Sequence, residues 1–260
     1  MKRVSVLIPL HNCEKTVRRS MMSVKNQTYT DVEVIAVDNN CTDNTMSIVE
    51  EFNEDLDIKI VKCSTPGITP TLNEGLRYCD GEFVARLDGD DFWYPEKLEK
   101  QIDFLDKNPS IGVVGTQIRL LDLEGNVQEE GTMGRKVNYP TSNDQIKVFL
   151  LYGQNPICHP SVVVRRKLFG LSGGYEHMFP RAEDLQLWLK LFPHTNFANI
   201  DETLVDYTQR KDEDYDARIP VLLGDMYYTL YKRAGLVQGE KEERVWDWQL
   251  DPNSHGNKRS

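Results

Sequence analysis

Three carboxylates within four residues are the segment of this sequence best able to do chemistry. Asp88, Asp90 and Asp91 follow directly after the apolar run 83–87. Carboxylates held this close together repel one another, which raises their pKa values unless a cation lies between them. Mg²⁺ and Mn²⁺ prefer carboxylate oxygens and usually share their ligands with substrate phosphates. The segment predicts a divalent-metal site that faces a phosphorylated ligand, with Gly89 allowing close approach. An acidic surface turn is the alternative that the segment alone leaves open.

A second polar cluster covers residues 38–43, at the end of the apolar run 32–37. Asp38 is placed to accept a hydrogen bond from a nucleobase or a ribose. Residues of these types also cap helices and form turns, so the cluster equally predicts the start of a helix. Both roles can hold together if different residues perform them.

A third candidate is the pair Glu183 and Asp184, which precedes the helical pattern 185–191. Acidic residues in a first helical turn are stabilised by the helix dipole, and spacing alone favours that explanation. The sharper alternative is a general base that faces a pocket. His159, in the segment 155–161, fits a hydrogen-bonded structural residue better than a catalyst.

Short apolar runs alternate with helical patterns over residues 1–118, which predicts βαβ units and a mainly parallel sheet flanked by helices. Ligands bind such sheets at the carboxyl ends of their strands, where Asp38 and Asp88 fall. The later sequence predicts a loop or hairpin over 122–145. The expected strands are 4–8, 32–37, 58–61, 83–87, 111–115 and 161–164, and the later expected helices are 71–78, 95–105, 183–191 and 219–231.

Composition excludes several classes of protein. The chain has 260 residues, and its 31 basic against 41 acidic side chains give a net charge of −10. An acidic chain does not suit broad nucleic-acid binding, which needs a basic face. Five scattered cysteines without a C-x-x-C pair argue against a zinc site and favour free thiols in a reducing compartment. We therefore expect a cytoplasmic protein. No apolar run approaches the length of a membrane span, and no export signal is evident.

Several segments, taken in order, resemble family 2 glycosyltransferases, which have the GT-A fold. The resemblance covers about residues 3–210. Residues 4–12 (VSVLIPLHN) are similar to the family's V-S-V-I-I-P-x-Y-N, and residues 34–43 (VIAVDNNCTD) to its V-V-D-D-G-S-x-D. Further similarities are LNEG at 72–75, DGEF at 80–83, DGDD at 88–91 against D-A-D-D, NPICHP at 155–160, and Glu183-Asp184 with Trp188 against E-D-x-x-L-W.

The resemblance implies an inverting transfer of a sugar, most commonly from a UDP-sugar, to a hydroxyl of a glycan, a lipid or another acceptor. It implies Mn²⁺ or Mg²⁺ held by Asp90 with Asp88. It also implies that Asp184 is the general base, with Glu183 beside it, and that Asp38 holds the uracil or ribose. The residues expected to contact the nucleotide-sugar are Pro9, His11, Asn12, Asp38, Asn39, Asn73, Asp88 and Gly89.

The sequence departs from the family pattern at three places. His11 replaces the usual tyrosine, and Asn39 replaces the second aspartate of the D-D pair. The arginine that some members carry near the nucleotide is missing from residues 66–72, and Arg77 or Arg86 is a candidate substitute. These departures leave the identity of the nucleotide base open.

Two other functions compete with the transferase. A sugar-phosphate nucleotidyltransferase would carry a glycine- and basic-rich loop after its first strand, but residues 10–15 hold no glycine. A binding module without turnover is disfavoured by the intact set of Asp88, Asp90 and Asp184.

The chain is expected to divide into three regions. These are a nucleotide-sugar-binding region (1–118), an acceptor-binding region with the base (119–210), and a helical C-terminal extension with a flexible tail (211–260). The amphipathic helix 219–231 is a candidate for homodimer or peripheral membrane contact.

Overall fold

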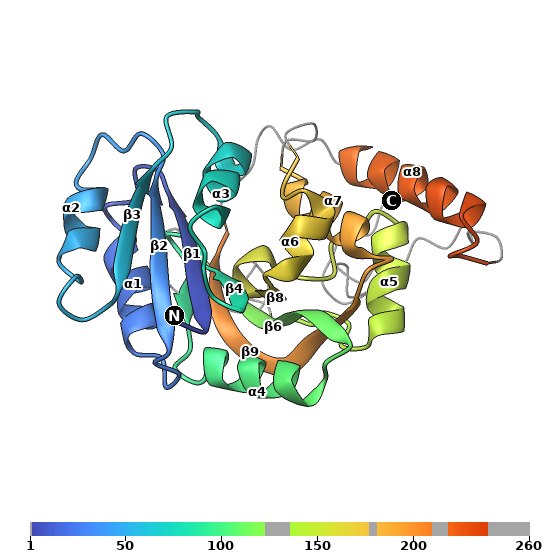
Figure 1. The fold of residues 1–260 in the computed structure, drawn as a ribbon, viewed down its shortest axis with the longest axis horizontal. Helices are drawn as coiled ribbons and strands as arrows, with labels where there is room; N and C mark the ends of the chain where they lie inside the picture. The colour runs from blue at the N-terminus through green and yellow to red at the C-terminus, as the bar shows by residue number, and fades with distance from the viewer. Residues whose placement is uncertain (1, 123–135, 177–180, 210–217, 239–260) are drawn as a thin grey trace, which may run out of the picture.

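The computed structural model describes residues 2–122, 136–176, 181–209 and 218–238. A nine-stranded sheet runs through these residues in the order β3-β2-β1-β4-β8-β6-β9-β5, and β7 pairs with β6. Helices lie on both sides of it (Figure 1). The fold is therefore α/β with a central sheet flanked by helices, as predicted.

The first half of the chain is built from parallel strands joined by helices, in agreement with the sequence. β2 and β4 pair with β1 on either side, and β3 pairs with β2, all in parallel register. The strands are β1 (Val4–Leu10), β2 (Val32–Asp38), β3 (Ile58–Lys62) and β4 (Phe83–Arg86), and the helices are α1 (Val17–Lys25), α2 (Thr45–Glu50) and α3 (Ile68–Leu76).

The second half extends the same sheet. β8 is antiparallel to both β4 and β6, and β9 is parallel to β6. β6 and β9 therefore run in the same direction as β1 to β4, so the sheet is mainly parallel, as predicted. The elements are β5 (Phe92–Trp93), α4 (Lys97–Lys107), β6 (Ile111–Leu121), β7 (Lys136–Val137), α5 (Asn143–Leu151), the 3₁₀ turn η1 (His159–Ser161), β8 (Val163–Arg165), α6 (Lys167–Ser172), α7 (Glu183–Leu191), β9 (Asn196–Thr208) and α8 (Arg218–Arg233).

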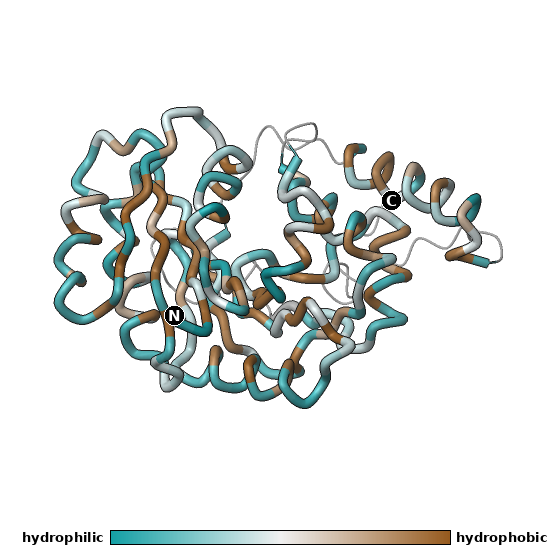
Figure 2. The backbone as a smooth tube through the Cα atoms, viewed as in Figure 1, coloured by the Kyte–Doolittle hydropathy of each residue, from teal (hydrophilic) through white to brown (hydrophobic). Residues whose placement is uncertain are grey.

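Alternate residues of each central strand supply two cores, one on each face of the sheet. In β1, Val4, Val6 and Ile8 pack with residues of α1, α2 and α4. Leu7 faces the other way, into the core formed with α3 and α5 to α8. Strands buried on both faces are continuously apolar, and Figure 2 shows hydrophobic residues concentrated along them.

Several predicted boundaries were wrong. The helix expected at 71–78 begins at Ile68, because Pro70 is tolerated in a first turn, where its missing N–H needs no partner. The strand expected at 161–164 is β8, which begins at Val163 after the turn η1. The loop or hairpin expected over 122–145 contains β7, which is antiparallel to β6, and it ends early, at α5. Residues 123–135 lie outside the described residues.

The C-terminal extension is described only as far as residue 238. The helix predicted at 219–231 is α8, whose Leu222, Met226 and Leu230 are exposed. No helix within the described ranges is both long and apolar enough to cross a bilayer. The expected tail at 251–260 lies outside the described residues, and contact of α8 with a second copy or a membrane stays a prediction.

Candidate active site

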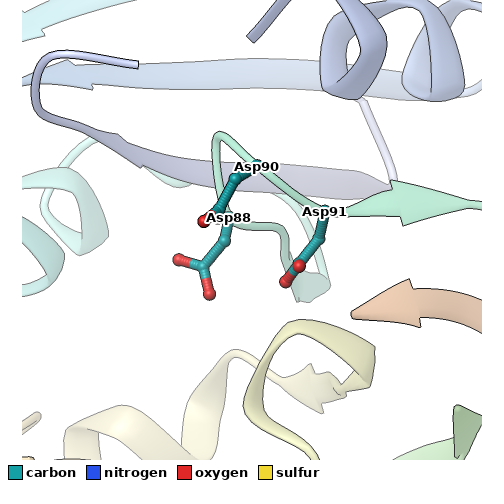
Figure 3. Close-up of side chains that lie close together, drawn as sticks. All are labelled: Asp88, Asp90 and Asp91. Atoms are coloured by element: carbon teal, nitrogen blue, oxygen red, sulfur yellow. The ribbon is translucent and has the colours of Figure 1, made fainter. Parts of the chain in front are cut away.

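The three carboxylates after β4 lie together, as their spacing predicts. Asp88, Asp90 and Asp91 each offer a carboxylate oxygen, and these oxygens lie within 4.8 Å of one another. Figure 3 shows the side chains projecting to the same side of the loop between β4 and β5. The loop is a tight turn, in which Asp91 N donates to Asp88 O at 3.2 Å.

Residues distant in sequence hold this loop in place. Thr208, at the end of β9, donates its N–H to Asp91 Oδ1 at 2.7 Å and its hydroxyl to Asp90 O at 2.5 Å. From α1, Arg19 donates to Asp90 O at 2.6 Å and Ser20 to Asp91 O at 2.7 Å. No local signal in the sequence could have identified these supports, because each lies at least 71 residues away from the group that it holds.

The charges of the loop fit a divalent cation. Asp91 is fully buried, and its Oδ2 has no hydrogen-bond partner within the described residues. Burial, together with the negative charges of Asp88 and Asp90, raises the pKa of Asp91 well above its ordinary value. A cation among these oxygens would remove that repulsion, and the hard carboxylate set suits Mg²⁺ or Mn²⁺.

Gly89 has a structural reason to be glycine that the sequence did not reveal. A Cβ atom at this position would lie 2.7 Å from Cys13 Sγ and 2.9 Å from Leu10 Cδ2. The structure shows close packing against the end of β1 and the segment that follows it, and the predicted close approach to a ligand stays a prediction.

Replacing Gly89 by alanine, the residue of the related D-A-D-D motif, should therefore destabilise the chain by about 1–3 kcal/mol through overpacking. Urea unfolding of Gly89→Ala measures this loss. The Cys13→Ala background removes the Sγ atom and should take away most of the loss. An equal loss in both backgrounds would contradict the packing explanation.

The pair Glu183 and Asp184 begins α7, so both candidate bases lie in its first turn. Asp184 Oδ1 accepts the N–H of Leu185 at 2.7 Å, and Oδ2 accepts Asn155 Nδ2 at 2.5 Å. Burial raises the pKa of Asp184, while these two bonds and Arg86 act in the opposite direction. Burial and the charge of Asp184 raise the pKa of Glu183 to about 7.

Arg86 contacts one group of carboxylates and acts electrostatically on both. It is 4% exposed, and its guanidinium donates to Asp88 Oδ1 at 2.5 Å. Its charge acts to lower the pKa values of Asp91, Glu183 and Asp184, so the acidic loop and the start of α7 lie within electrostatic reach of one cation. Arg77, the other candidate substitute, is exposed and pairs with Glu74.

Arg86, Asn155 and Glu183 each carry buried polar atoms without a hydrogen-bond partner in the described part of the chain. Within the described residues, Nε and Nη1 of Arg86, Oδ1 of Asn155 and Oε2 of Glu183 are buried and make no hydrogen bond. Buried polar groups are normally satisfied, so a group of unsatisfied ones favours a place that receives a polar ligand.

Five of the residues expected to contact the nucleotide-sugar lie at the carboxyl ends of β1 and β2, namely Pro9, His11, Asn12, Asp38 and Asn39. Asp38 Oδ1 accepts Cys41 N at 2.9 Å, a bond within the turn after β2, whereas the N-cap residue of α2, Asn44, makes no side-chain capping bond. Beside it, His11 Nδ1 lies 2.7 Å from Asn39 O, and Asn12 Oδ1 accepts Thr42 N at 2.8 Å. Pro9 is buried within β1 opposite Val37.

Two of the predicted residues make structural contacts instead of presenting their amides at the surface. Asn39 donates to the carbonyls of Cys63 and Thr65 and accepts from Gly67 N, which holds the loop before α3. Asn73 bonds both backbone groups of Tyr175, at 2.8 and 2.9 Å.

His159 has the structural role that was favoured for it. It is 7% exposed, and its Nε2 lies 2.9 Å from Tyr175 Oη. Burial lowers its pKa well below the ordinary value, so it is neutral at physiological pH.

Comparison with known proteins identifies the family. The model of the family described as glycosyl transferase family 2 matches residues 5–170. The chain belongs to glycosyl transferase family 2. Among curated relatives, EpsE of Bacillus subtilis is 31% identical over 220 residues, which cover 82% of this chain and 74% of EpsE. The UDP-Glc:alpha-D-GlcNAc-diphosphoundecaprenol beta-1,3-glucosyltransferase WfgD of Escherichia coli is 28% identical, over 76% of this chain and 72% of WfgD.

Solved structures share the fold of this glycosyltransferase. S. aureus TarS 1–349 in complex with UDP-GlcNAc matches with a TM-score of 0.65 and 24% identity, over 81% of this chain and 60% of TarS 1–349. The mannosyltransferase PcManGT from Pyrobaculum calidifontis, in complex with GDP-Man and Mn²⁺, matches with a TM-score of 0.66 and 21% identity. That match covers 92% of this chain and 65% of PcManGT. At these identities the structures support the GT-A fold alone, and the chain spans less than two thirds of the length of each.

Proposed function

We propose that this glycosyltransferase transfers a sugar from a UDP-sugar to an acceptor hydroxyl on a glycan or a lipid-linked glycan, with inversion at the anomeric carbon. The named activity of WfgD, a glucosyl transfer from UDP-Glc to a diphosphoundecaprenol-linked sugar, supports this donor and acceptor class. The UDP-GlcNAc in the TarS complex supports the same donor class. The assignment to polysaccharide biosynthesis follows from this acceptor.

One observation carries the proposal. Two groups of carboxylates on different elements, the acidic loop after β4 and the first turn of α7, interact electrostatically with the buried Arg86. In the proposal, Asp90 and Asp88 hold Mn²⁺ or Mg²⁺ on the donor diphosphate. When bound, the metal offsets the charge that builds up on the departing diphosphate. The Mn²⁺ in the PcManGT complex supports this choice of metal.

Asp184 then acts as the general base. The acceptor oxygen attacks the anomeric carbon, and its proton passes to the Asp184 carboxylate as the bond between that carbon and the diphosphate oxygen breaks. This is a single in-line displacement with no covalent intermediate, which parallels the base-assisted step of inverting glycoside hydrolysis. Glu183, whose pKa is raised to about 7, lies beside the base and remains partly neutral near that pH.

The nucleotide is placed over the carboxyl ends of β1 and β2. Asp38, His11, Asn12 and Pro9 form this edge in the structure. Three further residues are proposed to shape this edge without contacting the nucleotide: Asn39 and Asn73 hold neighbouring segments through hydrogen bonds, and Gly89 allows close packing.

The wider organisation also belongs to the proposal. We place the nucleotide-sugar on residues 1–118, the acceptor and base on residues 119–210, and the extension at 211–260. A cytoplasmic location is proposed because all five cysteines are free thiols, which suit a reducing compartment.

A thermal-shift screen of nucleotide-sugars tests donor binding directly. UDP-Glc, UDP-GlcNAc, UDP-Gal and GDP-Man are compared with and without Mn²⁺. A ligand at a hundred times its Kd stabilises the folded state by about 2.7 kcal/mol, which raises Tm by roughly 5–10 °C in a domain of this size. We expect such a rise with Mn²⁺ and at least one UDP-sugar. The absence of a rise with every donor would contradict the proposal, and a rise without turnover would support the binding-module alternative.

A further inference from the structure

The amide of Asn155 bonds directly to the carboxylate assigned as the base. Its Nδ2 lies 2.5 Å from Asp184 Oδ2, a charge-assisted contact from the segment between α5 and η1. An ionised carboxylate can only accept hydrogen bonds, so the NH₂ group of Asn155 must be the end of the amide that faces Asp184. The contact with an ionised Asp184 therefore sets the orientation of the Asn155 amide.

The backbone around Asn155 is held rigidly. Pro156 follows it and restricts its backbone to extended conformations. The carbonyl of Pro156 accepts a bond of 2.9 Å from Asn199 Nδ2 on β9, and Ile157 is fully buried. Asp184 is held at its other oxygen by the N–H of Leu185. An amide on a rigid segment thus meets a carboxylate at the start of a helix, and together these contacts fix the plane of the carboxylate.

We propose that Asn155 is a positioning residue for the base, which holds the Asp184 carboxylate in one orientation and stabilises its ionised form through the Nδ2–Oδ2 hydrogen bond. This inference rests on the role of Asp184 in the proposed function. Asn155 acts through Asp184 and is assigned no contact with the reacting atoms.

The other groups that face Asp184 come from three directions. Glu183 precedes it on α7 and Arg86 faces it from β4, while the titratable Tyr139, Cys158 and Tyr175 surround it from the neighbouring segments. Burial raises the pKa values of these two tyrosines and of Cys158, so all three are neutral at physiological pH. Arg86 and Asn155 thus act to lower the pKa of Asp184, whereas burial acts to raise it. The charge of Glu183 also raises it when that group ionises.

The test is the pH profile of kcat. Loss of a hydrogen bond to a charged group corresponds to about one to two pKa units. Asn155→Ala should therefore move the acidic limb of the profile upward by about one to two pH units, with activity recovering at higher pH. Asn155→Asp should move it further, because it replaces a donor by a second carboxylate. The control Asn108→Ala, which removes an amide bonded to the Phe104 carbonyl at the end of α4, should leave the limb unchanged.

A second readout needs no turnover. The bond favours ionised Asp184, so the stability lost in Asn155→Ala should grow as pH rises through the pKa of Asp184. Urea unfolding at several pH values measures this difference, and it should lose its pH dependence in the Asp184→Asn background. If Asn155→Ala does not fold, the nearly isosteric Asn155→Asp replaces it in both measurements.

The outcomes separate the two proposals. A pH-dependent stability difference in a chain that transfers no sugar would support the positioning role and contradict the proposed function. An active chain whose Asn155 variants keep the wild-type acidic limb would overturn the positioning role.

Discussion

Asp90→Ala is expected to weaken Mn²⁺-dependent binding of UDP by about 100-fold or more. Changes to residues that merely support a metal ligand cost roughly 10- to 100-fold in metal affinity in comparable sites, and Asp90 is assigned as a ligand itself. Its carboxylate is one of three whose oxygens lie within 4.8 Å of one another. Isothermal titration of UDP at fixed Mn²⁺ measures the loss, and titration without metal gives the baseline.

Without metal, the Asp90→Ala chain should be at least as stable as the wild type, although it binds UDP more weakly in the presence of Mn²⁺. The charge of Asp90 contributes to the raised pKa of the buried Asp91, so removing it relieves repulsion. We expect a Tm at least equal to that of the wild type without metal, and a much smaller rise when Mn²⁺ and UDP are added. Asp103→Ala, an exposed aspartate on α4 that pairs with Lys107, is the matched control and should keep the full rise. If Asp90→Ala bound UDP with wild-type affinity in the presence of Mn²⁺, Asp90 would not be a metal ligand.

Asp184→Asn is expected to lower kcat by about 10²- to 10⁴-fold, the usual contribution of a general base. The variant differs little in shape, and its single amide oxygen can accept the bond from Asn155 Nδ2 or from Leu185 N, but not both. Donor binding should therefore remain near the wild-type value, and the loss should fall on kcat. Release of UDP under saturating donor, Mn²⁺ and acceptor measures the rate, and thermal shift with UDP and Mn²⁺ measures binding.

Glu183→Gln distinguishes the roles of the two neighbouring carboxylates, Glu183 and Asp184. It removes a charge beside Asp184, so the pKa of Asp184 should fall and activity should persist toward lower pH. If instead Glu183→Gln abolished turnover while Asp184→Asn kept the wild-type kcat, the base would be Glu183.

Much of the fold could be predicted because local pattern determined it. β1, β2 and β4 are mostly apolar because both of their faces are largely buried, and α7 begins at the predicted Glu183. β9 was missed because its apolar alternation is interrupted at Asp201 and Glu202, where the register with β6 shifts. α5 was missed although Ser142 caps it by accepting the N–H of Gln145, a signature that the sequence S-N-D-Q displays.

The sequence predicted the main carboxylates of the site, but not the contacts that hold them in place. Spacing alone predicted the acidic loop, and family resemblance predicted the pair at 183–184. The contacts of Thr208 and Arg19 with the loop, and of Asn155 with Asp184, join residues far apart in the chain. Asn39 lies where the sequence predicted a contact with the nucleotide-sugar. Its amide, however, makes hydrogen bonds to the loop before α3.

The central claim is that this chain transfers a sugar from a nucleotide-sugar in a step that needs both a divalent metal and Asp184. Its most direct test is release of UDP from the UDP-sugar that gives the largest thermal shift, measured with wild-type chain and glycan or lipid-linked acceptors. The account predicts release that requires Mn²⁺ or Mg²⁺, stops on chelation with EDTA, and is lost in Asp184→Asn. Release at the same rate with EDTA, or equal release from Asp184→Asn, would contradict it.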